Sequence, residues 1–103
     1  MKTYLHIGGL VAAGFDPSGA YLLTITHSGR GVFSTQTWLR VARNTELAYP
    51  EAGVGVGIGP IDDQAIPVAE IDFDTGEMRL ASPNGRIVLV CESSGIAVTV
   101  TDT

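Results

Sequence analysis

The sequence has little cysteine, little positive charge and no long uninterrupted run of apolar residues. A single cysteine, Cys91, in 103 residues excludes an internal disulfide and a cysteine-rich zinc site. Six Lys and Arg residues stand against eleven Asp and Glu residues, and the net charge of −5 disfavours a nucleic-acid binder, which depends on neutralising phosphates. No segment approaches the ~18 consecutive apolar residues that cross a bilayer, so we expect no membrane association.

The N-terminal residues begin like a signal peptide, with Lys2 followed by an apolar stretch. His6, Gly8 and Gly9 interrupt that stretch, and no small-residue cleavage site follows it. We therefore expect a soluble cytoplasmic protein. The whole chain, residues 1–103, has the size of a single domain, and its 45% apolar content is enough for a hydrophobic core.

Turn signals recur at short intervals and divide the chain into short strand-like segments. The strongest is Asn84-Gly85, which predicts a hairpin with a type I′ turn. Strands are expected over residues 3–7, 10–15, 20–27, 30–34, 66–73, 77–81, 86–92 and 96–101. Residues 86–92 are apolar on both faces apart from their ends, so this strand is expected at the centre of its sheet. We predict an all-β fold of about eight to ten short antiparallel strands in meanders, as a sandwich or a partly open barrel.

Two segments leave alternatives open. Residues 35–49 fit a strand over 37–43 followed by a loop, which we favour, or one short helix near 35–48 capped by Ser34 or Thr35. Residues 50–60 alternate glycine with valine and isoleucine, which is typical of a strand with one bare face or of a loop packed through its valines.

No catalytic or metal-binding constellation stands out in the sequence. The two histidines, His6 and His27, lie on separate predicted strands, and no serine stands in a GxSxG elbow. Residues 53–59 lack the lysine of a phosphate loop, and residues 72–77 fail the spacing of a calcium loop. Cys91 lies on an apolar strand face, where we expect a buried thiol. We therefore predict a non-enzymatic protein without a cofactor or a metal.

Negative charge is concentrated in one part of the chain. From Asn44 to Met78 there are eight acidic residues and no Lys or Arg. Glu70, Asp72 and Asp74 alternate along a predicted strand and would repel one another on a shared face. This layout indicates a surface for a basic partner protein, the alternative being a solvated face that discourages edge pairing. The residues expected to bind the partner are Asp62, Asp63, Glu70, Asp72, Asp74 and Glu77.

A second interface is suggested by Trp38, the only tryptophan, together with Arg40 and Arg43. On a strand, Trp38 and Arg40 would share one face, and both residue types are frequent anchors of protein interfaces. The alternative is that Trp38 belongs to the core.

The stretch from Phe15 to Arg43, FDPSGAYLLTITHSGRGVFSTQTWLRVAR, resembles one blade of a WD-repeat or YVTN-type β-propeller. The shared features are Phe-x-Pro-x-Gly before an apolar strand and a Ser- and Gly-containing turn before the next strand. Val32-Phe33-Ser34 replaces the usual Trp-Asp, and the chain has room for far fewer than the about 4–8 blades of a propeller. The resemblance therefore implies meander hairpins and a protein-binding scaffold, not a closed propeller.

In size, acidity and lack of catalytic signals the chain is also similar to small bacterial immunity proteins, which neutralise toxins by direct binding. The expected function is a non-enzymatic protein-binding protein of the inhibitor or immunity type, which docks its acidic surface on a basic protein such as a toxin. The alternatives are a self-assembling β module that forms a homo-oligomer through its sheet edges, and a small enzyme of unknown class.

Overall fold

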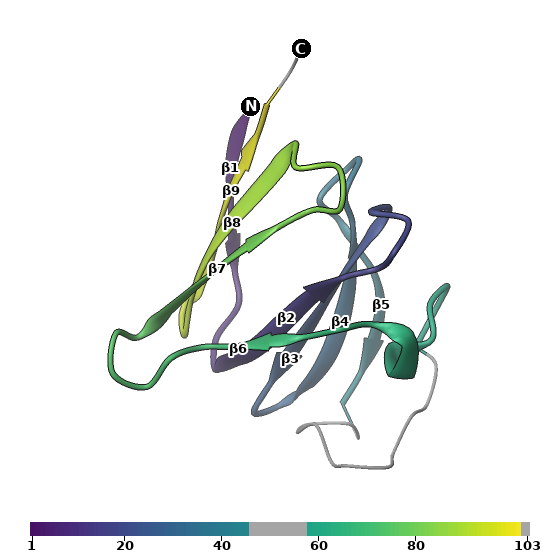
Figure 1. Ribbon diagram of the computed structural model, residues 1–103. Coiled ribbons are helices and arrows are strands. Elements are labelled where there is room, and N and C mark those ends of the chain that lie inside the picture. Colours follow the sequence, from purple (N-terminus) through teal and green to yellow (C-terminus); the bar gives the residue numbers. More distant parts are fainter. Residues whose placement is uncertain (46–57, 102–103) are drawn as a thin grey trace.

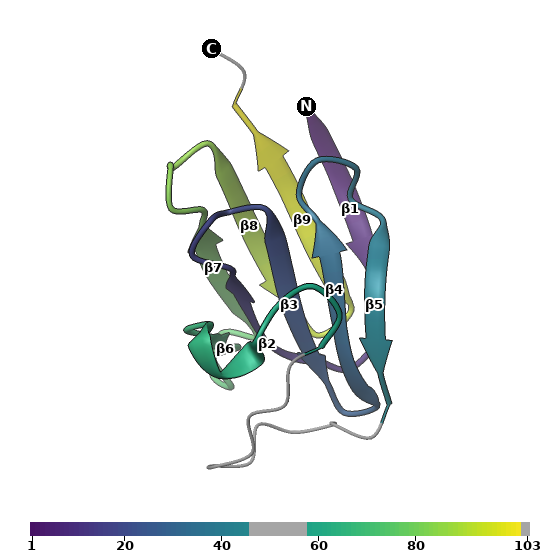
Figure 2. The same cartoon turned by 90° about the vertical axis from the view of Figure 1, so that its right-hand side faces the viewer.

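The computed structural model describes residues 1–45 and 58–101, which form nine strands in two antiparallel sheets (Figure 1). The elements are β1 (Lys2–His6), β2 (Leu10–Phe15), β3 (Tyr21–Thr26), β4 (Gly29–Ser34), β5 (Arg40–Asn44), a 3-10 turn η1 (Asp63–Ala65), β6 (Ala69–Glu70), β7 (Glu77–Ala81), β8 (Ile87–Glu92) and β9 (Gly95–Val100). One sheet has the order β1-β9-β8-β7 and the other the order β5-β4-β3-β2-β6. The two open sheets lie face to face (Figure 2), which confirms the predicted all-β fold.

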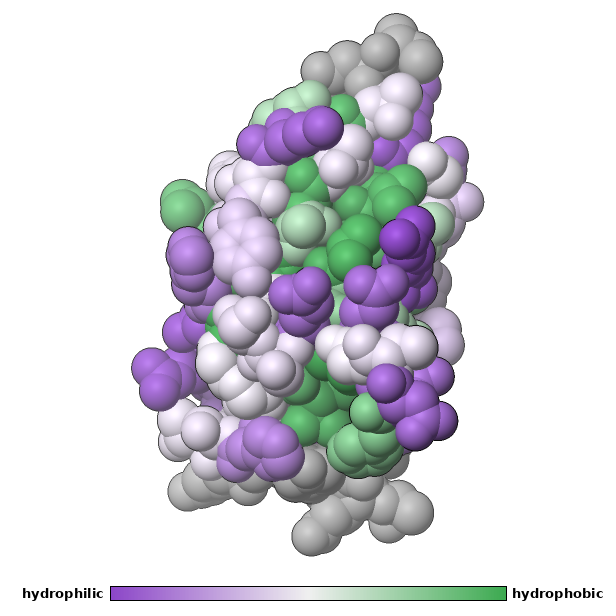
Figure 3. Space-filling model, turned by 90° about the vertical axis from the view of Figure 1, so that its left-hand side faces the viewer, coloured by the Kyte–Doolittle hydropathy of each residue, from purple (hydrophilic) through white to green (hydrophobic). Residues whose placement is uncertain are grey.

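The main core lies between the two sheets. Alternation along β8 and β9 turns Leu89, Cys91, Ile96 and Val98 inward, where each is no more than 1% exposed. β8 lies between β7 and β9, so its predicted central position is confirmed. The outer face of this sheet mixes apolar and hydrophilic side chains, and Val88 on it is 40% exposed (Figure 3).

A second, smaller core covers the opposite face of the β5-β4-β3-β2-β6 sheet. Ile58 and Ile66, from the segment before β6, pack there against apolar side chains of β2, β3 and β4. Gly14 allows this close approach, because a Cβ at position 14 would collide with the carbonyl oxygen of Pro67. This sheet is therefore covered on both faces.

A buried ion pair holds the same segment against the sheet. Nη1 of Arg30, on β4, contacts Oδ2 of Asp63, in η1, and the two side chains are 5% and 1% exposed. Each charge is taken out of water, so each needs the other as its partner. The pair joins residues far apart in the sequence and fixes η1 over β4.

The predicted Asn84-Gly85 hairpin is confirmed, but its turn is not type I′. Gly85 has a φ of 74°, whereas Asn84 keeps a negative φ. The N–H of Gly85 donates to the carbonyl of Ser82 at 2.9 Å, and the N–H of Ser82 donates to the carbonyl of Ile87 at 2.9 Å. Pro83 takes the first corner because its ring fixes a suitable negative φ, and glycine then supplies the left-handed residue.

The ambiguous segment after β4 forms one tight turn and then a strand. Ser34 Oγ accepts from the N–H groups of Gln36 and Thr37 at 3.2 and 3.4 Å, as a helix cap would. Trp38 then adopts a left-handed conformation with a φ of 58°, and β5 begins at Arg40. The strand interpretation is confirmed with a later start, and within the described part of this segment no helix follows the cap.

The predicted strand over residues 66–73 is wrong for most of its length. Only β6 pairs with β2, through Ala12 and Ala13. The residues before it pass over Gly14 as a connection, and those after it turn at Asp72, whose carbonyl accepts from the N–H of Gly76 at 2.8 Å. The end of the helical alternative, 46–48, and most of the glycine alternation, 50–57, lie outside the described residues.

Candidate functional site

The connection between β6 and β7 is the most prominent candidate for a binding site, because it projects from the body of the fold (Figure 1). Phe73 near its tip is 100% exposed. Asp72 Oδ1 accepts from the N–H of Asp74 at 2.7 Å, and Gly76 closes the turn with a φ of 75°. These local bonds shape the turn without using the aromatic ring, because Asp and Gly are the residues that stabilise such turns. The ring is therefore presented to solvent by a defined backbone.

Four of the six acidic residues predicted to bind a partner lie on or beside this turn. They are Glu70, Asp72, Asp74 and Glu77. Glu77 stands opposite Glu92 in the register of β7 and β8, which adds another carboxylate at the same end of the sheet. Arg79 Nε lies 3.8 Å from Glu77 Oε1, and this exposed pair offsets one of the four carboxylates. The acidic turn, defined as these four residues with Phe73, thus carries a net negative potential.

The other two predicted residues, Asp62 and Asp63, lie on the far side of the fold from the acidic turn (Figure 1). Asp63 is buried against Arg30 and does not present its charge to a partner, contrary to the expectation. Asp62 is exposed but is separated from the acidic turn. The predicted six-residue surface is therefore reduced to its last four residues.

Trp38 belongs to the main core and is only 9% exposed, so it does not anchor the predicted second interface. It precedes β5 and shares no strand face with Arg40. Arg40 and Arg43 are both exposed on β5, and the guanidinium carbon of Arg40 lies 5.4 Å from the centre of the Phe33 ring. The predicted trio is thus divided between the core and an edge strand.

Sequence reasoning missed Phe73, because alternation along the predicted strand puts Ile71 and Phe73 on the face opposite Asp72 and Asp74. The signal against that interpretation was Asp74-Thr75-Gly76 directly after it, a turn sequence that ends any strand. A fully exposed aromatic beside exposed carboxylates is the type of side chain that anchors protein interfaces.

Cys91 confirms its predicted burial, being 0% exposed. Burial raises the pKa of this thiol to about 11, so it stays protonated and unreactive at neutral pH. Among residues 1–45 and 58–101, no group of three or more His, Cys, Asp or Glu side chains is placed to hold a metal ion. The same residues contain no helix with the length and apolar content that crossing a membrane requires.

Comparison of the chain with protein-family models, with curated proteins and with solved structures finds no match. The functional interpretation therefore depends on the chemistry of the molecule's own surface.

Proposed function

We propose that this chain is a non-enzymatic binding protein that docks its acidic turn on a basic partner protein. The observation that carries the proposal is Phe73, whose ring is fully exposed between two exposed aspartates. Burial of a Phe side chain is worth about 1.5–3 kcal/mol, and this stabilisation is forgone in the free protein. It becomes available when the ring enters an apolar pocket of a partner, where aromatic anchors dominate binding energy.

The carboxylates of the acidic turn define the chemistry of that partner. They would face a rim of Lys and Arg around the pocket, which speeds encounter and fixes the orientation of docking. An inhibitor or immunity-type protein that acts on a basic protein, such as a toxin, is the specific form of this proposal. The overall acidity of the chain supports it, with eleven acidic against six basic residues.

The rest of the fold would act as a rigid support. Strands β2 to β5, which contain the stretch that resembles a propeller blade, form an antiparallel meander that is covered on both faces. β6 joins the edge of this sheet, and β7 joins the other sheet. The acidic turn is therefore held at both ends by strands of different layers, which limits the conformational entropy lost on binding.

The test is capture of native proteins by the immobilised chain, compared among variants. Phe73→Ala is expected to lower capture of a basic protein by about tenfold or more, as loss of an aromatic hot spot does. Leu39→Ala is the matched control, because Leu39 is also an exposed apolar side chain, at 67%, and lies on the turn before β5. Asp74→Asn is expected to weaken capture most at low salt, whereas Asp62→Asn, on the far side of the fold, leaves it unchanged.

Two results contradict the proposal. In the first, Phe73→Ala and Leu39→Ala lower capture equally. In the second, Asp72→Asn/Asp74→Asn captures the partner as strongly as the wild type at low salt as well as at high salt. The alternative of self-assembly through sheet edges is examined separately by light scattering, where a monomer at micromolar concentration excludes it.

A further inference from the structure

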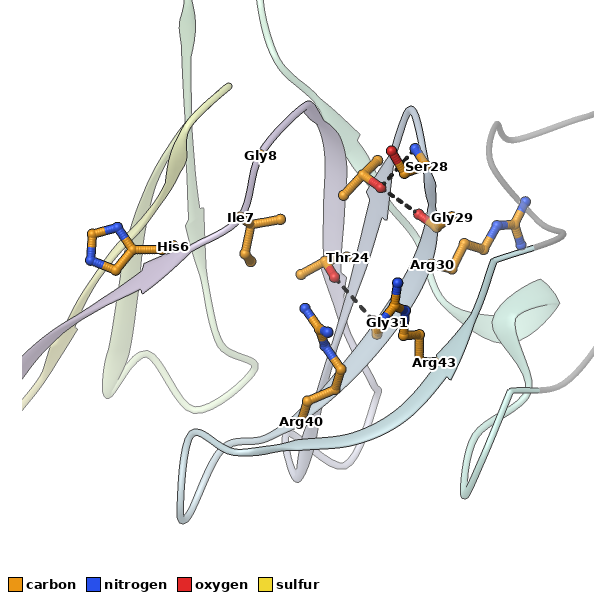
Figure 4. A pocket seen from close by; sticks show the side chains of 11 residues that line it. His6, Ile7, Gly8, Thr24, Ser28, Gly29, Arg30, Gly31, Arg40 and Arg43 are labelled. Carbon is orange, nitrogen blue, oxygen red and sulfur yellow. Dashed lines mark hydrogen bonds between the residues drawn. The ribbon is translucent and has the colours of Figure 1, made fainter.

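A cavity of about 180 Å³ lies between the end of β1 and the inward face of β3, β4 and β5 (Figure 4). Along β4 the inward positions are Phe33, Gly31 and Gly29, because alternate residues of a strand share a face. The main core ends at Phe33, and the two glycines leave the floor without side chains. Ile7 and Gly8 form the opposite wall. The sequence of β4 thus creates the hollow.

Two guanidinium groups from β5 reach over this floor (Figure 4). Arg43 pairs with Gly31 and Arg40 pairs with Phe33, so both side chains lie on the inward side of the sheet. A Cβ added at Gly31 would lie 3.5 Å from Arg40 Nε and 3.2 Å from Thr24 Oγ1, so these polar atoms border the bare position. The Phe33 ring contacts the Arg40 guanidinium and restricts its position.

The cavity is basic although the protein is acidic. Three of the six Lys and Arg residues line it, and none of the lining residues that the structure describes is Asp or Glu. Arg30 extends away from the cavity toward Asp63, and the His6 ring also turns away, so the positive charge inside comes from Arg40 and Arg43 (Figure 4). In the part of the chain that the structure describes, no carboxylate lies within 4.0 Å of either group. Two neighbouring cations repel, and an anion between them relieves that repulsion.

We propose that this cavity binds a small oxyanion, the phosphate or carboxylate group of a small molecule, between Arg40 and Arg43. Planar guanidinium groups donate paired hydrogen bonds that match the oxygen spacing of both anions. The volume of about 180 Å³ is below the roughly 300 Å³ at which sites for drug-sized ligands begin, so the ligand carries few atoms beyond the oxyanion. The site is independent of the acidic turn and of its partner.

The proposal is tested by titrating the ¹⁵N-labelled protein with sodium phosphate, sodium sulfate and sodium acetate at constant ionic strength. The amide signals of Gly29 and Gly31 and the Nε–H signals of the arginines are expected to shift and saturate. Arg40→Gln and Arg43→Gln are each expected to weaken binding about tenfold or more, because each removes a charge-assisted donor pair. Arg86→Gln makes the same change of charge at an exposed residue outside the cavity and is expected to leave binding unchanged.

Each outcome decides for or against the site. Saturation by acetate alone assigns a carboxylate ligand, and saturation by phosphate and sulfate assigns a tetrahedral oxyanion; both support the proposal. Two results overturn it. One is signal shifts that rise linearly, without saturation, for all three anions. The other is binding that Arg86→Gln weakens as much as Arg40→Gln and Arg43→Gln do. Arg40 and Arg43 are exposed, so their variants are expected to fold, which the same spectra verify. Gly31→Ala, which places a methyl group on the floor, is expected to weaken binding without any change of charge.

Discussion

Replacement of Asp63 by asparagine is expected to lower the free energy of unfolding by about 3–5 kcal/mol, the usual cost of removing one partner of a buried ion pair. The Arg30 side chain is 5% exposed beneath the segment that carries η1, so its buried charge would lose the Asp63 carboxylate and face a neutral amide instead. A domain of this size has a total stability of only about 5–15 kcal/mol, so the effect is large. Urea unfolding followed by the fluorescence of Trp38, which is buried in the main core, measures it directly.

The control for this prediction is Glu77→Gln, which removes the partner of the exposed Arg79 and is expected to change stability by less than about 1 kcal/mol. The double variant Arg30→Met/Asp63→Leu is expected to recover most of the loss, because apolar groups of similar volume replace buried ion pairs at little cost. An Asp63→Asn variant within about 1 kcal/mol of the wild type, or a double variant no more stable than the single one, refutes the reasoning.

Two further predictions concern close packing and the buried thiol. Gly14→Ala is expected to destabilise the fold by about 1–3 kcal/mol or more, because the carbonyl of Pro67 occupies the space of the new methyl group. In the control Gly8→Ala the new methyl group meets nothing within 4 Å, so stability should change by less than about 1 kcal/mol. Equal effects of the two substitutions contradict this prediction. Burial raises the pKa of Cys91 from an ordinary 9.0 to about 11, so the unfolded chain loses this proton first, and stability should fall by up to about 3 kcal/mol as pH rises from 9 to 11. Cys91→Ala removes this part of the pH dependence, and parallel curves for the two proteins above pH 9 contradict it.

The strands that could be predicted are those in which local pattern and burial agree. In β8 and β9 the inward positions are apolar at every second residue, and strong turn signals bound both strands. The Asn84 turn shows the limit of such signals, because Pro83 before it fixes a different corner from the one that Asn-Gly prefers alone. Strands that pair with the next strand along the chain were thus predictable, whereas the exact type of the turn between them was not.

The candidate site could be predicted only in its composition. Alternation of Ile71 and Phe73 with acidic residues has the period of a strand, but the Asx turn at Asp72 stops the strand and exposes Phe73. Asp63 was assigned to the surface because its partner, Arg30, is separated from it by 33 residues, a distance at which pattern carries no information. Tertiary contacts decide both outcomes.

The arginine cavity also depends on tertiary contacts, although its residues lie close together in the sequence. Gly29, Gly31 and Phe33 alternate in the sequence, and Arg40 and Arg43 follow closely, so all of its parts were visible. Their meaning depends on the register of β4 with β5, which places Arg43 beside Gly31 and was not predictable from either strand alone.

The fold places the acidic turn and the arginine cavity on different sides of the molecule (Figure 1). The β6–β7 connection carries carboxylates at one side of the molecule, and β5 carries arginines near the other (Figure 1). Charges on the surface are screened beyond a Debye length of roughly 8 Å at physiological ionic strength, so the two regions should act independently. Oxyanion binding at Arg40 and Arg43 is therefore expected to leave capture through Phe73 unchanged, and Phe73→Ala is expected to leave oxyanion binding unchanged. Should phosphate nevertheless change the affinity for the partner, Arg40→Gln separates two explanations. If the change persists in Arg40→Gln, phosphate acts at another place. If Arg40→Gln abolishes the change, the two sites are coupled through the sheets.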